Sequence, residues 1–276
     1  MTRSASLLLV ALVLTSACAS APPAPPLAES VQGPEEFQLS PFRWIEGVRL
    51  SYIVETFEET AFGERVESKR SRQVIQMSAA GKARDGMTRV RFSADNTSVA
   101  DGMFDQNGRL KDVSILLKGP ESVVKMLNGT ITRMVQHPQF AQFENAVLKI
   151  NERVTTEVLL SEFLAPLITT AESPEPTTAF SLTYTGHKRV KSVMAAELRS
   201  SLTMSPKGTY LMSLPGLKNR VEVNSMNLES TEWVDPSRRY LMLKYEVVTM
   251  GFVTSGKTFF SRQVTVTTLD RSASRI

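Results

Sequence analysis

The chain has 276 residues, of which 42% are hydrophobic, and its 32 Lys and Arg residues slightly outnumber its 28 Asp and Glu residues. Acidic and basic residues alternate, as in 64–72 (ERVESKRSR), whereas a nucleic-acid surface gathers Lys and Arg on one face. This mixture argues against a nucleic-acid partner and favours a solvated strand. The single cysteine excludes an intramolecular disulfide, so the fold must depend on a packed core.

Residues 1–17 have the pattern of a secretory signal peptide. Arg3 supplies the positive charge, and the apolar run 5–14 is shorter than the roughly 20 residues that span a bilayer. Cys18 follows the small and polar residues 14–17 (LTSA), which resembles the lipobox of bacterial lipoproteins, although Thr15 replaces the usual leucine. The resemblance implies that Cys18 is acylated, for example with palmitate, and becomes the new N-terminus.

Two other interpretations of the leader stay open. Ordinary signal peptidase could cleave after Ala19 or Ala21, and Cys18 could be an inert part of the leader. If Cys18 is lipidated, the absence of Asp directly behind it resembles outer-membrane rather than inner-membrane lipoproteins. We therefore expect an outer-membrane anchor and a domain that faces the periplasm.

Residues 18–36 are rich in Pro and Ala and predict an extended polyproline II tether, roughly 50 Å long from residue 19 to residue 34. A proline-rich motif for a partner domain is the alternative. Residues 37–276 are then expected to form a single β-rich domain, because no second apolar stretch is long enough to span a membrane.

Strands are predicted on both sides of a central helical insertion. In 49–115, residues 86–96 (GMTRVRFSADN) alternate with period two, and Asn107-Gly108 marks a hairpin. In 120–170, apolar residues at helical spacing predict helices in 119–136 and 155–173, with Pro166 breaking the second. Strands return over 180–269, with turns at Pro215-Gly216, Asp235-Pro236 and Ser255-Gly256. The predicted class is mainly β (α+β): a curved antiparallel sheet or unclosed barrel with the helices as lid or plug.

Residues that could support catalysis or metal binding are few. His137 precedes a proline, His187 is placed in a turn, and neither has a partner at metal-ligand spacing. The acidic residues near the predicted hairpin lack the glycine and glutamate register of a calcium loop. Glu58 and Glu59 are adjacent on a strand, so they point to opposite faces. We expect no enzyme, no metal and no cofactor.

The lipidated leader, the long antiparallel strands and the helical insertion resemble the half-barrel family of the LolA and LolB lipoprotein carriers, over roughly residues 37–269. The resemblance implies a helical lid over a concave face that takes acyl chains. Only the lipidated cysteine is carried over from it.

The resulting hypothesis is a non-enzymatic envelope carrier whose concave face binds a lipid or acyl chain. The alternative is a structural or assembly lipoprotein that docks to another envelope protein. Methionine-rich walls would adapt to varied apolar ligands. The candidate ligand-binding residues are Met126, Leu127, Met134, Leu160, Phe163, Met194 and Met204.

Overall fold

A computed structural model describes residues 21–40, 42–82, 86–116, 143, 146–159, 168–171, 177–204, 208–214 and 217–276. Within these residues the protein is all β, with sixteen strands and no helix. Fourteen strands form one large antiparallel sheet that does not close, and β2 and β8 form a separate pair. The mainly β class and the unclosed antiparallel sheet are therefore confirmed.

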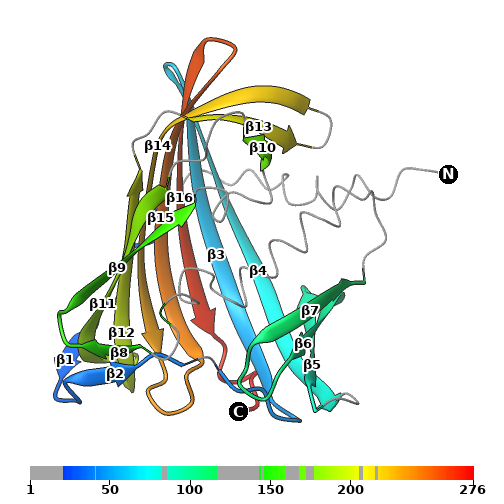
Figure 1. Ribbon diagram of the computed structural model, residues 1–276, viewed down its shortest axis with the longest axis vertical. Helices are drawn as coiled ribbons and strands as arrows, with labels where there is room; N and C mark the ends of the chain where they lie inside the picture. The colour runs from blue at the N-terminus through cyan, green and yellow to red at the C-terminus, as the bar shows by residue number, and fades with distance from the viewer. Residues whose placement is uncertain are drawn as a thin grey trace.

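The sheet runs in the order β1-β11-β12-β14-β15-β16-β3-β4-β5-β6-β7, with β9 added at β11 and with β13 and β10 added at β14. Its long central strands lie side by side with a marked twist, and β5–β7 lie at the other end of the sheet from β1, β9 and β11 (Figure 1). The strands are β1 (Glu29–Val31), β2 (Glu36–Gln38), β3 (Arg49–Phe62), β4 (Arg65–Lys82), β5 (Thr88–Ala94), β6 (Thr97–Phe104), β7 (Leu110–Ile115), β8 (Val147–Lys149), β9 (Arg153–Leu159), β10 (Ile168–Ala171), β11 (Thr177–Val190), β12 (Val193–Met204), β13 (Gly208–Leu214), β14 (Leu217–Val234), β15 (Leu241–Thr254) and β16 (Lys257–Leu269).

The strands predicted over 49–115 and 180–269 are present in the described residues. The turns at Asn107-Gly108, Asp235-Pro236 and Ser255-Gly256 have the expected chemistry, and Pro215-Gly216 lies outside the described residues. In the β6–β7 hairpin, Asp105 Oδ1 accepts hydrogen bonds from the backbone N–H groups of Asn107 and Arg109. Gly108 has φ +85°, and a Cβ there would overlap the backbone of Phe42, so only glycine fits. Ser255 and Gly256 both have positive φ in the two-residue turn between β15 and β16.

The second predicted helix, over 155–173, is contradicted wherever the structure describes it. Residues 153–159 and 168–171 are strands β9 and β10, and β9 pairs with β11 along its whole length. In β9, Val154, Thr156 and Val158 are more buried than Thr155 and Glu157 between them, which is the period of a strand. The β-branched residues fit that pleated surface and outweigh the apolar spacing. The helix predicted over 119–136 lies outside the described residues.

The N-terminal strap, which we define as residues 21–40, is packed on the sheet instead of standing free as a tether. Its strand β1 pairs with β11 at the edge of the sheet. Before β1, the Tyr245 hydroxyl, near the start of β15, donates a hydrogen bond to the Pro23 carbonyl. After β1, Phe37 and Leu39 are buried in a core beside β11, β12 and β14. The strap therefore wraps around the edge formed by β11.

Candidate functional site

Cross-strand register assigns side chains to the two faces of the sheet, because paired residues point to the same side. One face carries Leu198, Leu202 and Leu228, and we call it the core face. The opposite face carries Glu197, Arg199 and Trp233, and we call it the groove face.

A row of three methionines crosses the core face. Met204 on β12 pairs with Met226 on β14, which pairs with Met250 on β15. Met204 and Met226 are buried, and Met250 packs against the same cluster. Thioether side chains are unbranched and polarisable, so such a row can repack around different apolar shapes.

The seven candidate ligand-binding residues have different outcomes. Met204 lies in the methionine row, whereas Met194 is 53% exposed at the other end of β12, ten residues away. The structure does not bring these two residues together. Met126, Leu127, Met134, Leu160 and Phe163 lie outside the described residues, as does Cys18.

A buried charge cluster lies beside the apolar part of the core face. Lys244 Nζ is 2.6 Å from Glu246 Oε2 and 3.4 Å from Glu232 Oε1. Burial alone would lower the pKa of Lys244, but Glu246 and Glu232 outweigh burial and raise that pKa. The neighbouring Ser200 and Ser230 hydroxyls are buried and find no hydrogen-bond partner among the described residues.

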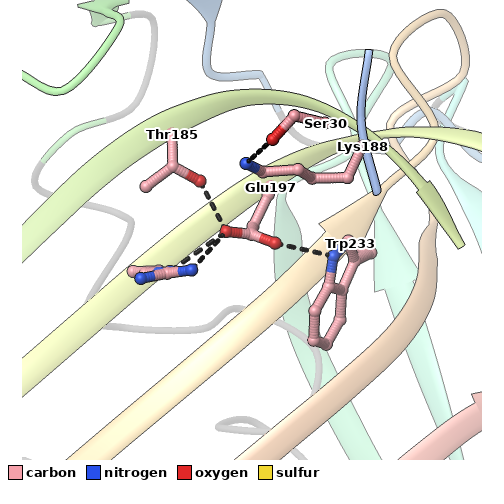
Figure 2. Close-up of polar contacts among 6 residues, drawn as sticks. Ser30, Thr185, Lys188, Glu197 and Trp233 are labelled. Carbon is pink, nitrogen blue, oxygen red and sulfur yellow. Dashed lines mark hydrogen bonds and ion pairs between the residues drawn. The ribbon is translucent and has the colours of Figure 1, made fainter. Parts of the chain in front are cut away.

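Glu197 is the centre of the polar network on the groove face. Its Oε1 accepts hydrogen bonds from Thr185 Oγ1 at 2.6 Å and from Arg199 Nε at 3.0 Å, and its Oε2 accepts one from Trp233 Nε1 at 3.0 Å. Figure 2 shows Thr185 and Trp233 directed at the Glu197 carboxylate. Glu197 is only 2% exposed, and a buried charge is costly unless it is hydrogen-bonded. The three donors satisfy that requirement.

A cavity of about 410 Å³ lies on the groove face beside this network. One register row crosses it over five strands: Arg153, Thr183, Arg199, Thr231 and Tyr245. Pro25 of the N-terminal strap lines the same cavity.

A second, smaller cavity of about 170 Å³ adjoins the first. It lies between Pro25 and Pro26 of the strap and Lys188, Glu197 and Trp233 of the sheet. The Lys188 ammonium donates a hydrogen bond to the Ser30 hydroxyl beside it (Figure 2). The strap therefore borders both hollows of the groove face.

His187 does not lie in a turn, contrary to the prediction. It is a residue of β11, 5% exposed, and follows a bulge at Gly186, whose φ is +96°. Its Nδ1 lies 2.8 Å from the Tyr184 hydroxyl, which donates to the Pro34 carbonyl at 3.0 Å. A hydroxyl has one proton, so Nδ1 then donates to the Tyr184 oxygen. His137 lies outside the described residues.

Neither a metal cluster nor a helix of membrane-spanning length and hydropathy occurs in the described part of the chain. No known family model matches the sequence, and a search of curated proteins finds none that matches it. Sequence reasoning missed Arg153, Glu197, Arg199 and Glu229. Alternation places each on a strand face, but only the pairing register brings their three strands, β9, β12 and β14, together at the two adjoining cavities.

Proposed function

We propose that this chain is a bacterial envelope lipoprotein that binds an apolar ligand, a lipid or an acyl chain, without catalysing a reaction. Cys18 carries the lipid anchor in the outer membrane, and the sheet faces the periplasm. The observation that carries the ligand assignment is the methionine row Met204, Met226 and Met250 on the core face.

The apolar region around this row supports binding of a long, flexible ligand. Phe180, Leu202 and Leu228 extend it over β11, β12 and β14. An acyl chain entering here has to part side chains that are already packed, and methionines repack at low cost. The unclosed antiparallel sheet agrees with the expectation raised by the resemblance to the half-barrel carriers.

Binding of a fatty-acid-like fluorophore tests this function. The chain from residue 19 to residue 276, without leader and anchor, should bind the probe saturably with a stoichiometry near one, and lipid should displace it. Met250→Gln keeps the length of the side chain but adds a polar amide to the row, so we expect the probe Kd to rise about fivefold. Met194→Gln is the matched control at an exposed position and should leave the Kd unchanged.

A folded protein that binds no such probe contradicts the carrier function. If Met250→Gln and Met194→Gln weaken probe binding equally, the ligand does not bind at the methionine row. Thermal melting of each variant separates loss of binding from loss of fold.

Membrane fractionation of Cys18→Ala tests the anchor. Because no other apolar stretch of the sequence is long enough to span a bilayer, we expect the variant to leave the membrane fraction, while the unchanged chain pellets with membranes. If Cys18→Ala pellets as fully as the unchanged chain, the lipid anchor is wrong. Ser16→Ala, beside the cysteine, is the control that keeps the acylated residue.

A further inference from the structure

The cavity on the groove face exists because short side chains lie between long ones. Its floor is formed by the Ser and Thr residues of two adjacent register rows, Ser181, Thr183, Ser201 and Thr231. Arg153 and Arg199 rise from the first row, and Glu229 rises from the second. Four hydroxyls therefore line the floor of a hollow whose sides are charged.

The two arginines flank a single hydroxyl. Arg153 on β9 and Arg199 on β12 both pair with Thr183 on β11, so their Cα atoms are two strand spacings apart, about 10 Å. Arg199 is held in place by Glu197, and its side chain is still 61% exposed. Arg153 is exposed and has no ion-pair partner within the described ranges. Long guanidinium side chains at this separation can close on one phosphate.

Glu229 adds the opposite charge at the same cavity. It pairs with Ser201, next to Arg199 along β12, and its Oε1 accepts a hydrogen bond from Asn227 Nδ2 at 3.3 Å. The carboxylate is exposed and keeps further acceptor positions. A simple anion would be repelled by this group, whereas a ligand that carries both signs would use it.

We propose that this cavity binds a zwitterionic phospholipid headgroup of the phosphoethanolamine type. The phosphate lies between Arg153 and Arg199 over the Thr183 hydroxyl, and the primary ammonium lies at Glu229. The cavity volume of about 410 Å³ is within the usual range for small-ligand sites.

The strap indicates a bilayer as the source of the headgroup, and this choice of source rests on the proposed anchor at Cys18. Pro23 is fixed on the groove face by Tyr245, and Pro25 lines the cavity. Cys18 precedes Pro23 by five residues, which span at most about 18 Å. A lipid anchor at Cys18 therefore keeps the groove face near the membrane surface.

Vesicle co-sedimentation tests the headgroup site. The chain 19–276 lacks the anchor and retains every described residue, so its binding reports the protein surface alone. We expect binding to vesicles of mixed phosphatidylethanolamine and phosphatidylcholine, weakened about fivefold or more by Arg153→Gln and by Thr183→Val. Arg65→Gln is the matched control, because Arg65 is 78% exposed at the turn between β3 and β4, and it should change nothing. Soluble glycerophosphoethanolamine should compete.

The ammonium contact has its own control. Phosphatidylcholine has a quaternary ammonium that cannot donate a hydrogen bond, so we expect weaker binding to pure phosphatidylcholine vesicles, and Glu229→Gln should abolish that preference. Equal loss with Arg65→Gln and Arg153→Gln, or no vesicle binding, overturns the proposal. Tight binding of the soluble headgroup without vesicle binding overturns the bilayer source.

The test is independent of the fluorophore assay. Met250→Gln should leave vesicle binding intact, and Arg153→Gln should leave fluorophore binding intact, because the two residues lie on opposite faces. Failure of one assay therefore does not decide the other.

Discussion

At the scale of single residues, Glu197 shows how this sheet accommodates a buried charge. Its carboxylate accepts from a hydroxyl, a guanidinium and an indole, and each donor comes from a different residue of the groove face. A carboxylate can satisfy all three donors at once because both of its oxygens accept hydrogen bonds. The residue fixes Arg199 and Trp233 in place at the wall of the cavities.

We expect Glu197→Gln to destabilise the fold by about 2 kcal/mol, because the amide nitrogen turns one acceptor into a donor and leaves a buried donor unpaired. The shift of the urea unfolding midpoint measures the loss. Glu229→Gln is the control on the neighbouring strand: its carboxylate is exposed, so the change should stay within about 0.5 kcal/mol. Equal midpoints for the two variants would show that the network does not stabilise the sheet.

His187 is the second residue whose environment predicts a measurable effect. Burial lowers its pKa, and the positive charge of Arg239 lowers it further. Lys188 is its neighbour on β11, and Glu29 lies in the strand β1 that pairs there. The strap covers the ring closely, since a Cβ on Gly33 would lie 2.5 Å from Nδ1.

Stability should therefore fall as the solution becomes acidic. The unfolded chain binds a proton at an ordinary histidine pKa of 6.5, whereas folded His187 resists protonation. The stabilising contribution is complete above pH 6.5 and is lost as the pH falls from there through the lowered pKa. Urea midpoints between about pH 7.5 and about pH 5 measure this, and His187→Asn should flatten the dependence. If the urea midpoint of His187→Asn falls with pH as steeply as that of the unchanged chain, the acid sensitivity comes from other groups.

At the scale of elements, period-two alternation was sufficient to predict a strand wherever one of its faces is buried and the other is exposed to solvent. In β5, Thr88, Val90 and Phe92 are buried and Arg89 and Arg91 are exposed, as the sequence predicts. The helix predicted over 155–173 rested on apolar residues at helical spacing, such as Leu159, Leu160 and Phe163, and that spacing did not identify the strand β9. Pairing with β11 decides its structure.

The strap and the groove could not be predicted for a related reason. A proline-rich stretch predicts an extended backbone but carries no signal for the surface on which that backbone packs. The groove residues are polar positions on polar strand faces, indistinguishable from solvated ones until the register brings Arg153 and Arg199 to either side of Thr183. Long-range pairing, not local propensity, determines both features.

At the scale of the whole molecule, the sheet has two distinct ends. The end with β9, β11 and β12 carries the methionine row, the groove and the strap. The other end, β5 to β7, contributes Phe92 and Phe104 to a core that also contains Val190, Ala195 and Trp233 of β11, β12 and β14. The proposed ligand sites therefore occupy opposite faces of the same few strands, with the backbone of the sheet between them.

The middle of the sheet joins the two ends of the chain. Strand β3 pairs with β16 over eleven residue pairs, from Tyr52–Leu269 to Phe62–Phe259, and Arg49 forms a bridge with Arg275. The proposed export of this chain across a membrane would deliver β3 long before β16. An exported β3 would then wait with an open edge, which is the kind of surface that chaperones bind and that aggregates when left uncovered. Folding would be completed only after the last strand has emerged, so a truncation that removes β16 leaves the two halves of the sheet unconnected.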